Sequence, residues 1–286
     1  MTKNGYGIDA PIREGRVKGW DGTEIAYYVG GSGTDKLVMA PGLGTPFITW
    51  KYLIEKLQDR YTIVTWDPRG TYRSAIPSAT GRMKIEDHVR DMVSVCEAEG
   101  LDRFHLGGWS MGVQICLEYC HQFPQAAQSL MLIAGAFQHV LSTALNVPFS
   151  RGILTTALVS ARALSPVIGP AASMALRSGR LINILGVAGM VTGNRPHFAR
   201  MARELSYTDW HTYFDLILQY DRHSAAPYLS SIRIPTLVMA GDSDKLTPMP
   251  VSIETHRAIP GSELFVVHRG THYLLVEFPE VVNTRI

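Results

Sequence analysis

Short runs of apolar residues alternate with longer amphipathic stretches between Arg16 and Ala134. The short runs predict buried strands, because each one ends in the Gly, Pro or Asp residues at which strands give way to loops. The predicted strands are residues 36–40, 61–66, 104–108 and 129–134. Apolar residues with helical spacing lie between them, at residues 50–57, 85–99 and 111–123. Alternation of strands and helices is typical of β-α-β units built around a mostly parallel sheet.

The alternating pattern stops after Ala136 and resumes with predicted strands at residues 234–240 and 263–267. The stretch between them carries apolar segments of helical length, interrupted by prolines and without a clear strand. We therefore predict a helical cap inserted after the sixth strand of an α/β core. The predicted core comprises residues 1–137 and 232–286, and the predicted cap comprises residues 138–231.

The most apolar stretch of the predicted cap, residues 181–191, is too short for a bilayer-spanning helix of about 20 residues. It predicts a core helix of the cap that also forms the wall of a substrate pocket, and a membrane-surface contact is the alternative. The cap as a whole has more apolar side chains than its short helices need for their own packing. These side chains are Ile153, Leu154, Leu158, Leu181, Ile182, Ile184, Leu185, Val187, Met190 and Val191.

Composition narrows the classes of protein that this pattern allows. The chain has 286 residues, of which 46% are hydrophobic and 18% are charged, so one large folded domain is expected and a disordered chain is excluded. A net charge of +2 is too small for the field that binding to a nucleic-acid backbone requires. Residues 1–7 contain no apolar run of signal-peptide length, so we expect a cytoplasmic protein.

The chain has three cysteines, which cannot all pair with one another. Cys116 and Cys120 lie four residues apart, a spacing that places both thiols on one face of a predicted helix. We interpret them as reduced core residues of a protein in a reducing compartment. Zinc binding by this pair together with His121 is the alternative, but no second pair with matching spacing lies nearby. We therefore predict no metal site.

The sequence Gly108-Trp109-Ser110-Met111-Gly112 joins a predicted strand to a predicted helix. This strand-turn-helix context is the one required of a nucleophile elbow, in which a serine is exposed on a sharp turn. Glycine is required at positions 108 and 112, because the strand and helix backbones approach closely there and leave no room for a Cβ atom. An ordinary glycine-rich turn is the alternative interpretation.

A serine hydroxyl is a poor nucleophile near neutral pH, so it needs a base within hydrogen-bonding reach and a carboxylate to orient that base. Two later loops supply candidates. Asp242 and Asp244 follow one predicted strand, and His272 follows the next. Ligands bind α/β sheets outside the carboxyl ends of the strands, so these side chains are expected to converge with Ser110 at one edge of the sheet. The residue pattern therefore indicates nucleophilic catalysis by Ser, His and Asp.

Together these residues resemble those of the α/β-hydrolase-fold serine hydrolases, and the resemblance covers nearly the whole chain. It implies an eight-stranded, mostly parallel sheet with helices on both faces and an inserted helical cap. In this family the acid commonly stands three residues after the glycine that ends its strand, with a proline four residues further on, which selects Asp244 over Asp242. His272 resembles the family's histidine, because Glu277-Phe278-Pro279-Glu280 follows it at the start of the last helix.

Hydrolysis through an acyl-enzyme also needs N–H donors for the tetrahedral oxyanion. The N–H of Met111, directly after the serine, is the first expected donor. The segment Ala40-Pro41-Gly42-Leu43-Gly44 stands where the family usually has His-Gly-x-Gly, so the resemblance implies that Leu43 N–H is the second donor. Pro41 replaces the histidine that braces this loop in the family. A plain turn between strand and helix is the alternative interpretation.

The segment from Asp67 to Ser74 resembles the family's Asp-x-Arg-Gly-x-Gly-x-Ser sequence after the fourth strand. We expect Asp67 and Arg69 to fix the geometry of the loop, with substrate binding by the arginine as the alternative. Tyr72 stands in place of a glycine of that sequence, which makes it a candidate to face the pocket.

The expected reaction is hydrolysis of a carboxylic ester with an apolar acyl or alkyl group by Ser110, His272 and Asp244, without a cofactor. A thioester, a lactone or a carbon-carbon bond is an alternative substrate, because the fold hosts all of these reactions. A binding or receptor protein of the same fold is a second alternative, although such a protein has no need of a serine, an acid and a base in this order. The expected partner is a small apolar ester and not a nucleic acid, and the oligomeric state is left open.

Overall fold

The computed structural model describes residues 5–79, 81–143 and 150–286, so residues 1–4 of the predicted core, residue 80, and residues 144–149 of the predicted cap lie outside the described part. Eight strands form one sheet in the order β1-β2-β4-β3-β5-β6-β7-β8. They are β1 (Ile12–Lys18), β2 (Glu24–Gly30), β3 (Asp35–Ala40), β4 (Tyr61–Trp66), β5 (Phe104–Trp109), β6 (Ala127–Ile133), β7 (Thr236–Gly241) and β8 (Glu263–Val267).

Strands β3 to β8 run parallel to one another, whereas β2 is antiparallel to both of its neighbours, β1 and β4. The mostly parallel eight-stranded sheet is therefore confirmed, and each of the six strands predicted from the apolar runs is present, with ends that differ by at most two residues. Strands β1 and β2 have no counterpart among the predicted strands. Strand β1 lies at the edge of the sheet, and its side chains are exposed or only half-buried, so it lacks an apolar run.

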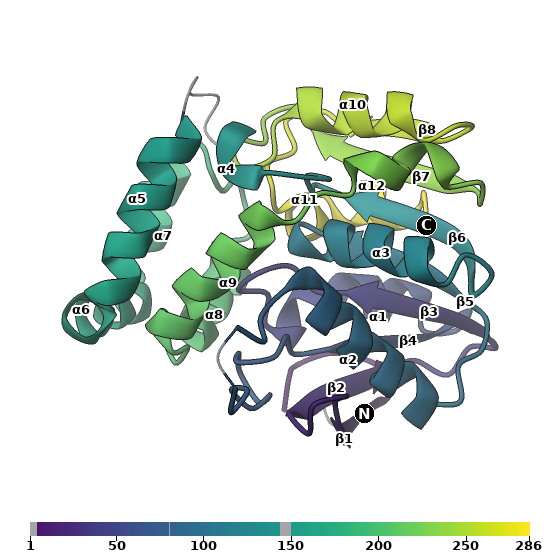
Figure 1. Cartoon of the computed structure of the whole chain (residues 1–286), viewed down its shortest axis with the longest axis horizontal. Helices are drawn as coiled ribbons and strands as arrows, with labels where there is room; N and C mark the ends of the chain where they lie inside the picture. Colours follow the sequence, from purple (N-terminus) through teal and green to yellow (C-terminus); the bar gives the residue numbers. More distant parts are fainter. Residues whose placement is uncertain (1–4, 80, 144–149) are drawn as a thin grey trace.

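Helices cover both faces of the sheet, as Figure 1 shows. Helices α2, α3 and α10 pack on one face, and α1, α11 and α12 pack on the other. Strand β3 supplies side chains to both cores, with Val38 and Ala40 on one face and Leu37 and Met39 on the other, which explains its continuous apolar run. The bounds are α1 (Lys51–Leu57), preceded by the 3₁₀ helix η1 (Phe47–Trp50), α2 (Ile85–Ala98), α3 (Met111–Gln122), α10 (Met249–Ala258), α11 (Leu274–Glu277) and α12 (Pro279–Asn283).

Six helices and a 3₁₀ helix lie between β6 and β7 in the described residues. They are α4 (Val140–Thr143), α5 (Ser150–Ala163), α6 (Ser165–Arg177), α7 (Arg180–Val187), α8 (Arg195–Leu205), α9 (Trp210–Arg222) and η3 (Ala226–Ser231). The chain leaves and rejoins the sheet at one place, because Gln138 and Ser224 form an isolated antiparallel bridge. In Figure 1 the helices α5, α6 and α7 lie at the end of the molecule furthest from the sheet. The cap boundaries at residues 138 and 231 stay a prediction.

The apolar stretch at residues 181–191 is not a core helix, and this part of the prediction is wrong. It forms α7 and the turn after it, and within α7 only Ile182 is buried, while Val187 is 92% exposed. Helix α7 lies between a cavity and the solvent, so the rest of the protein covers only one of its faces. In the described part of the chain no single helix is long and apolar enough to cross a bilayer, and α5 and α6 meet that test only as a pair bent by 98°.

Arg69 and Asp67 fix the loop after β4. The Arg69 side chain is fully buried, and its Nε and Nη2 donate to the two carboxylate oxygens of Asp91 at 2.7 and 2.5 Å. Its Nη1 donates to Asp21 at 3.0 Å. Asp67 accepts hydrogen bonds from the Tyr28 hydroxyl at 2.8 Å and from a backbone N–H of the same loop. Both side chains hold elements of the core together, in agreement with the structural role expected of them.

Replacing Arg69 should be costly because it leaves a buried carboxylate without its partner. We expect Arg69→Leu to lower the free energy of unfolding by about 3–5 kcal/mol. Arg285→Leu is the matched control, since it breaks an ion pair with Glu263 that is exposed to solvent, and it should cost less than about 1 kcal/mol. Urea unfolding followed by circular dichroism measures both changes, and equal small losses would contradict the role assigned to the buried pair.

Candidate active site

Ser110 stands between β5 and α3 in a strained backbone conformation. Its φ of 57° and ψ of −117° lie outside the regions that non-glycine residues normally occupy. A Cβ atom on Gly108 would come within 2.3 Å of the Gly112 carbonyl oxygen, and one on Gly112 would come within 2.2 Å of the Ala40 carbonyl oxygen. Both glycines are therefore needed for the close approach of β3, β5 and α3 around the serine, as the sequence motif predicts.

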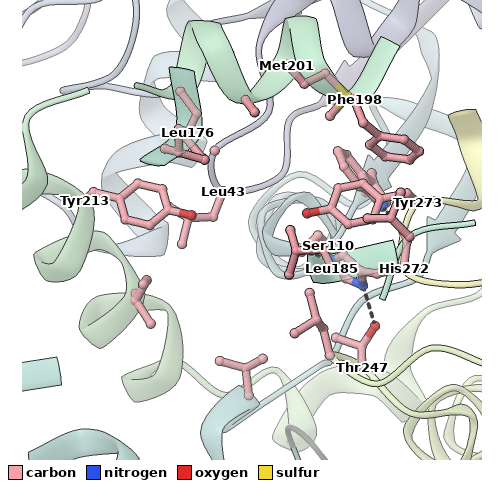
Figure 2. Close-up of a pocket in the computed structure, with 18 of the residues that line it drawn as sticks. Leu43, Ser110, Leu176, Leu185, Phe198, Met201, Tyr213, Thr247, His272 and Tyr273 are labelled. Atoms are coloured by element: carbon pink, nitrogen blue, oxygen red, sulfur yellow. Dashed lines mark hydrogen bonds between the residues drawn. The ribbon is translucent and has the colours of Figure 1, made fainter. Parts of the chain in front are cut away.

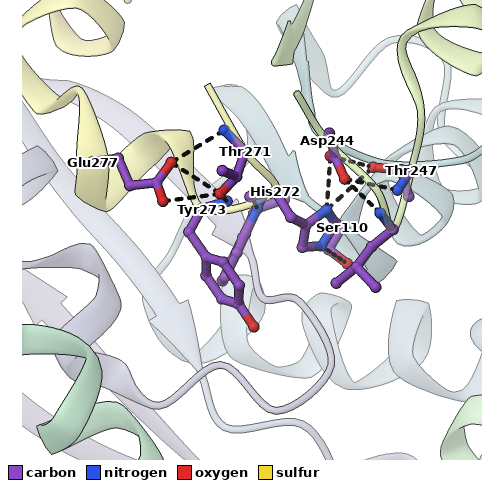
Figure 3. Close-up of polar contacts among 9 residues, drawn as sticks. Ser110, Asp244, Thr247, Thr271, His272, Tyr273 and Glu277 are labelled. Atoms are coloured by element: carbon purple, nitrogen blue, oxygen red, sulfur yellow. Dashed lines mark hydrogen bonds and ion pairs between the residues drawn. The ribbon is translucent and has the colours of Figure 1, made fainter. Parts of the chain in front are cut away.

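The structure brings Ser110, His272 and Asp244 into one hydrogen-bonded line, shown in Figure 3. The distance from His272 Nε2 to Ser110 Oγ is 2.9 Å, and the distance from His272 Nδ1 to Asp244 Oδ2 is also 2.9 Å. All three side chains are buried. Because a carboxylate only accepts hydrogen bonds, Nδ1 carries the proton in this arrangement and Nε2 is free to accept the proton of the serine.

Asp244 is held as a carboxylate by its neighbours. Burial alone would raise its pKa, but His272 and the hydrogen bonds from Thr247 outweigh burial and bring the pKa below the ordinary value for aspartate. Oδ1 accepts from the backbone N–H groups of Leu246 and Thr247 at 2.8 and 2.9 Å, and Oδ2 accepts from the Thr247 hydroxyl at 2.8 Å. Asp244 therefore carries its negative charge beside the imidazole at neutral pH.

Asp242 lies outside this line. Its carboxylate is bonded to His268 Nδ1 at 2.8 Å and to the backbone N–H of Arg269 at 2.7 Å, on the exposed side of the loop. Of the two neighbouring aspartates, Asp244 reaches His272 and Asp242 braces the turn between β8 and the histidine loop.

The two expected oxyanion donors flank the serine. A Cβ atom on Gly42 would come within 3.1 Å of Ser110 Cβ, so the loop that contains Leu43 lies directly against the serine. Met111 is the first residue of α3, where a backbone N–H has no partner within the helix. Among the described residues neither the Leu43 N–H nor the Met111 N–H donates a hydrogen bond. Both groups are available to a ligand atom next to Ser110.

A cavity of about 300 Å³ opens beside Ser110 and His272 (Figure 2). Its walls are mostly apolar and come largely from the cap. The cap residues that line it include Leu176, Ile182, Leu185, Val191, Phe198 and Met201. Of the ten cap side chains predicted to form the pocket wall, Ile182, Leu185 and Val191 do so, whereas Ile153, Ile184 and Val187 point to solvent.

Two tyrosine hydroxyls interrupt the apolar surface of the cavity. Figure 2 shows the rings of Tyr213, from α9, and Tyr273, next to His272, with their hydroxyls directed into the cavity from different sides. Neither hydroxyl makes a hydrogen bond to another described residue. Tyr72, the sequence candidate for a pocket-facing residue, does not line the cavity, and that expectation is wrong. Its hydroxyl is buried.

Sequence reasoning assigned no role to Thr247 or Glu277, which hold the site in place. The Thr247 hydroxyl lies 2.8 Å from Asp244 Oδ2 and 3.2 Å from His272 Nδ1. The Glu277 carboxylate accepts from the backbone N–H and the hydroxyl of Thr271, and also from the backbone N–H of Thr192 in the cap at 2.6 Å. The spacing of Asp244 and Thr247, three residues apart, is a capping pattern that could have revealed the first of these contacts.

The cysteines and the neighbouring histidine do not form a metal site. Cys116 and Cys120 are buried in α3, and burial raises the pKa of the Cys120 thiol to about 12. The His121 ring instead stacks on the Tyr228 ring with a centroid distance of 4.3 Å. Across the described ranges no three His, Cys, Asp or Glu side chains gather closely enough to hold a metal ion.

A family model for the alpha/beta hydrolase fold matches residues 36–279, which include the serine, the aspartate and the histidine of the site. The chain therefore belongs to the alpha/beta hydrolase fold family. This membership, together with relatives named as hydrolases, supports hydrolase activity.

Curated relatives include a putative carbamate hydrolase, RutD, from Agrobacterium fabrum, which is 29% identical over 87% of this chain and 90% of its own. The RutD of Azorhizobium caulinodans is 25% identical over 91% of this chain and 92% of its own. Among solved structures, an esterase from Exiguobacterium antarcticum has a TM-score of 0.77 at 20% identity, covering 94% of this chain and 96% of its own. At that identity the likeness concerns the fold.

The two aspartates give a matched test of the site. Asp244→Asn should lower kcat by about 10³–10⁴-fold, because an amide at this position favours the wrong imidazole tautomer. Asp242→Asn should leave most of the activity, since this side chain does not reach His272. Steady-state kinetics with one activated ester measures both variants. A larger loss in Asp242→Asn than in Asp244→Asn would show that the acid has been assigned to the wrong residue.

Proposed function

We propose that this protein is a serine hydrolase that cleaves a carboxylic ester with an apolar acyl or alkyl group through an acyl-enzyme. The observation that carries the proposal is the line of hydrogen bonds from Ser110 through His272 to Asp244, which ends at the wall of an apolar cavity. A serine, a base and an orienting carboxylate at 2.9 Å spacing form the arrangement that activates a hydroxyl for acyl transfer.

The proposed reaction has two steps. In the first, Ser110 Oγ attacks the ester carbonyl carbon while His272 Nε2 takes the hydroxyl proton, and the N–H groups of Leu43 and Met111 bind the oxyanion that forms. The imidazolium then gives this proton to the leaving alcohol as the carbon–oxygen bond breaks. In the second step His272 takes a proton from a water molecule that attacks the acyl-enzyme, and the imidazolium then returns this proton to Ser110 Oγ as the acyl–oxygen bond breaks and the acid is released. Asp244 stabilises the imidazolium in both steps.

The cavity supports a substrate of modest size with an apolar part. Its volume of about 300 Å³ is at the lower end of the range for ligand pockets, about 300–1,000 Å³. An apolar wall stabilises each buried methylene by about 0.8 kcal/mol relative to water. Carbamate hydrolysis is a second candidate function, because relatives covering most of the chain carry that name, and the same nucleophile and base apply to it.

Activation of Ser110 can be tested without knowledge of the natural substrate. A fluorophosphonate probe should add one adduct to the wild-type protein, seen by intact mass, and none to Ser110→Ala. The same substitution should lower ester hydrolysis by several powers of ten. Circular dichroism of Ser110→Ala should match the wild type, so that loss of the adduct reports the nucleophile rather than the fold. A wild-type protein that stays unlabelled would instead favour a binding protein of this fold.

Acyl-chain length tests the apolar cavity. We expect kcat/KM for p-nitrophenyl esters to rise from acetate by roughly tenfold for every two methylenes until the cavity is filled. Leu185→Ala enlarges the cavity and should move the preferred ester to a longer chain. Ile184→Ala, one residue away and 62% exposed, should leave the profile unchanged. A flat profile, or one that falls steadily from acetate, would contradict the proposed substrate class.

A further inference from the structure

The outer side of the cap carries an unusual concentration of exposed apolar side chains. In the described part of the chain fourteen large apolar residues are exposed, and eight of them lie between residues 153 and 187. Four of these eight residues are at least 70% exposed, namely Ile153 in α5, Val167 and Met174 in α6, and Val187 in α7. Isolated exposed apolar residues are common on soluble domains, but a group of this size on three consecutive helices indicates an interaction surface.

The exposed side chains follow the helical repeat. Val167 and Met174 are seven residues apart, about two turns, so they lie on one face of α6. Ile184 and Val187 are three residues apart on one face of α7, and Ile182 and Leu185 form the opposite face, which lines the cavity. Helix α7 is therefore apolar on two sides, and only one side is covered by the protein. The exposed sides of α5, α6 and α7 together form the outer cap surface.

Charge is strongly segregated toward this part of the molecule. Residues 119–203 contain seven arginines and no Lys, Asp or Glu, although the whole chain carries a net charge of only +2. The remaining residues therefore carry a net charge of −5. Three of the seven pair with carboxylates further along the cap, as Arg151 does with Asp221. The other four have exposed side chains and no carboxylate partner among the described residues. Two of them belong to the helices of the outer cap surface, Arg177 at the end of α6 and Arg180 at the start of α7, and Arg195 and Arg203 lie in the neighbouring helix α8.

We propose that the outer cap surface binds the surface of a membrane that contains anionic phospholipids. Apolar side chains on helices lying in the plane of a membrane bury themselves at the boundary between headgroups and acyl chains, while neighbouring arginines attract anionic headgroups. The outer cap surface offers both features on adjacent helices at the end of the molecule away from the sheet (Figure 1). In this position the cavity lies one helix, α7, away from the lipid.

Charge also decides between a membrane and a second copy of this chain. A symmetric dimer through the outer cap surface would bring Arg177 and Arg180 of both copies together, and α5, α6 and α7 contain no carboxylate to neutralise them. Like charges placed opposite one another in an interface are costly. An anionic bilayer supplies the missing negative charge and an apolar layer at once.

Vesicle co-sedimentation tests the proposal without relying on catalysis. The wild-type protein should bind vesicles of phosphatidylcholine mixed with phosphatidylglycerol, bind pure phosphatidylcholine at least tenfold more weakly, and dissociate as salt is raised. Val187→Asp places a carboxylate on the apolar face, and Arg180→Glu reverses an exposed charge. Each should weaken binding to the anionic vesicles about tenfold or more.

Matched controls carry the same changes elsewhere. Val281→Asp, at a 43% exposed position in α12, and Arg103→Glu, in the exposed turn before β5, should leave vesicle binding unchanged. Absence of vesicle binding, or an equal effect of cap and control variants, overturns the proposal. A wild-type dimer that becomes a monomer in Val187→Asp would also overturn it, because a second copy of the chain would then cover the outer cap surface. Circular dichroism of each variant shows that the fold is retained.

Discussion

The strained turn at Ser110 is the constraint on which the rest of the site depends. A non-glycine residue with φ of 57° costs on the order of 1–3 kcal/mol and persists only where its surroundings enforce it. Here the Ser110 N–H donates to the Ile133 carbonyl oxygen at 3.0 Å, and the Ser110 carbonyl oxygen accepts from Val113 N–H at 3.0 Å. The two glycines around it allow β3, β5 and α3 to meet. This close packing also brings the Leu43 loop beside the serine, so nucleophile and oxyanion donors are positioned by one constraint.

The parts of the fold that could be predicted are those with a local physical cause. Strands buried on both faces need unbroken apolar runs, and the elbow needs glycines beside the serine, so both leave a signal in the sequence. Strand β1 was not predicted because an edge strand with exposed side chains needs no such run. The apolar stretch that forms α7 shows that an apolar helix exists, but not which of its sides the chain covers. Thr247 was missed because its contact with His272 depends on how two distant loops meet.

Directional polar contacts, in addition to apolar packing, fix where the cap joins the core. The His223 ring, directly after α9, lies 3.0 Å from both Gln114 Oε1 and Glu118 Oε2 on α3. The hydrogen bond from His223 is the main reason why the pKa of Glu118 falls to about 2, with burial acting in the opposite direction. Hydrogen bonds have a preferred direction, whereas apolar contacts tolerate sliding. The base of the cap is therefore tied by directional contacts to the helix that begins at the serine.

The Glu277 carboxylate joins two segments that are 79 residues apart in the chain, the cap at Thr192 and the histidine loop at Thr271. Each of its oxygens accepts a backbone N–H from one of these segments. Both oxygens also accept from the Thr271 hydroxyl at 2.9 Å, so the carboxylate is held by the cap and by the histidine loop at the same time. The two amide protons are therefore protected by the same side chain. They should exchange with solvent as one cooperative unit, although they belong to different parts of the fold.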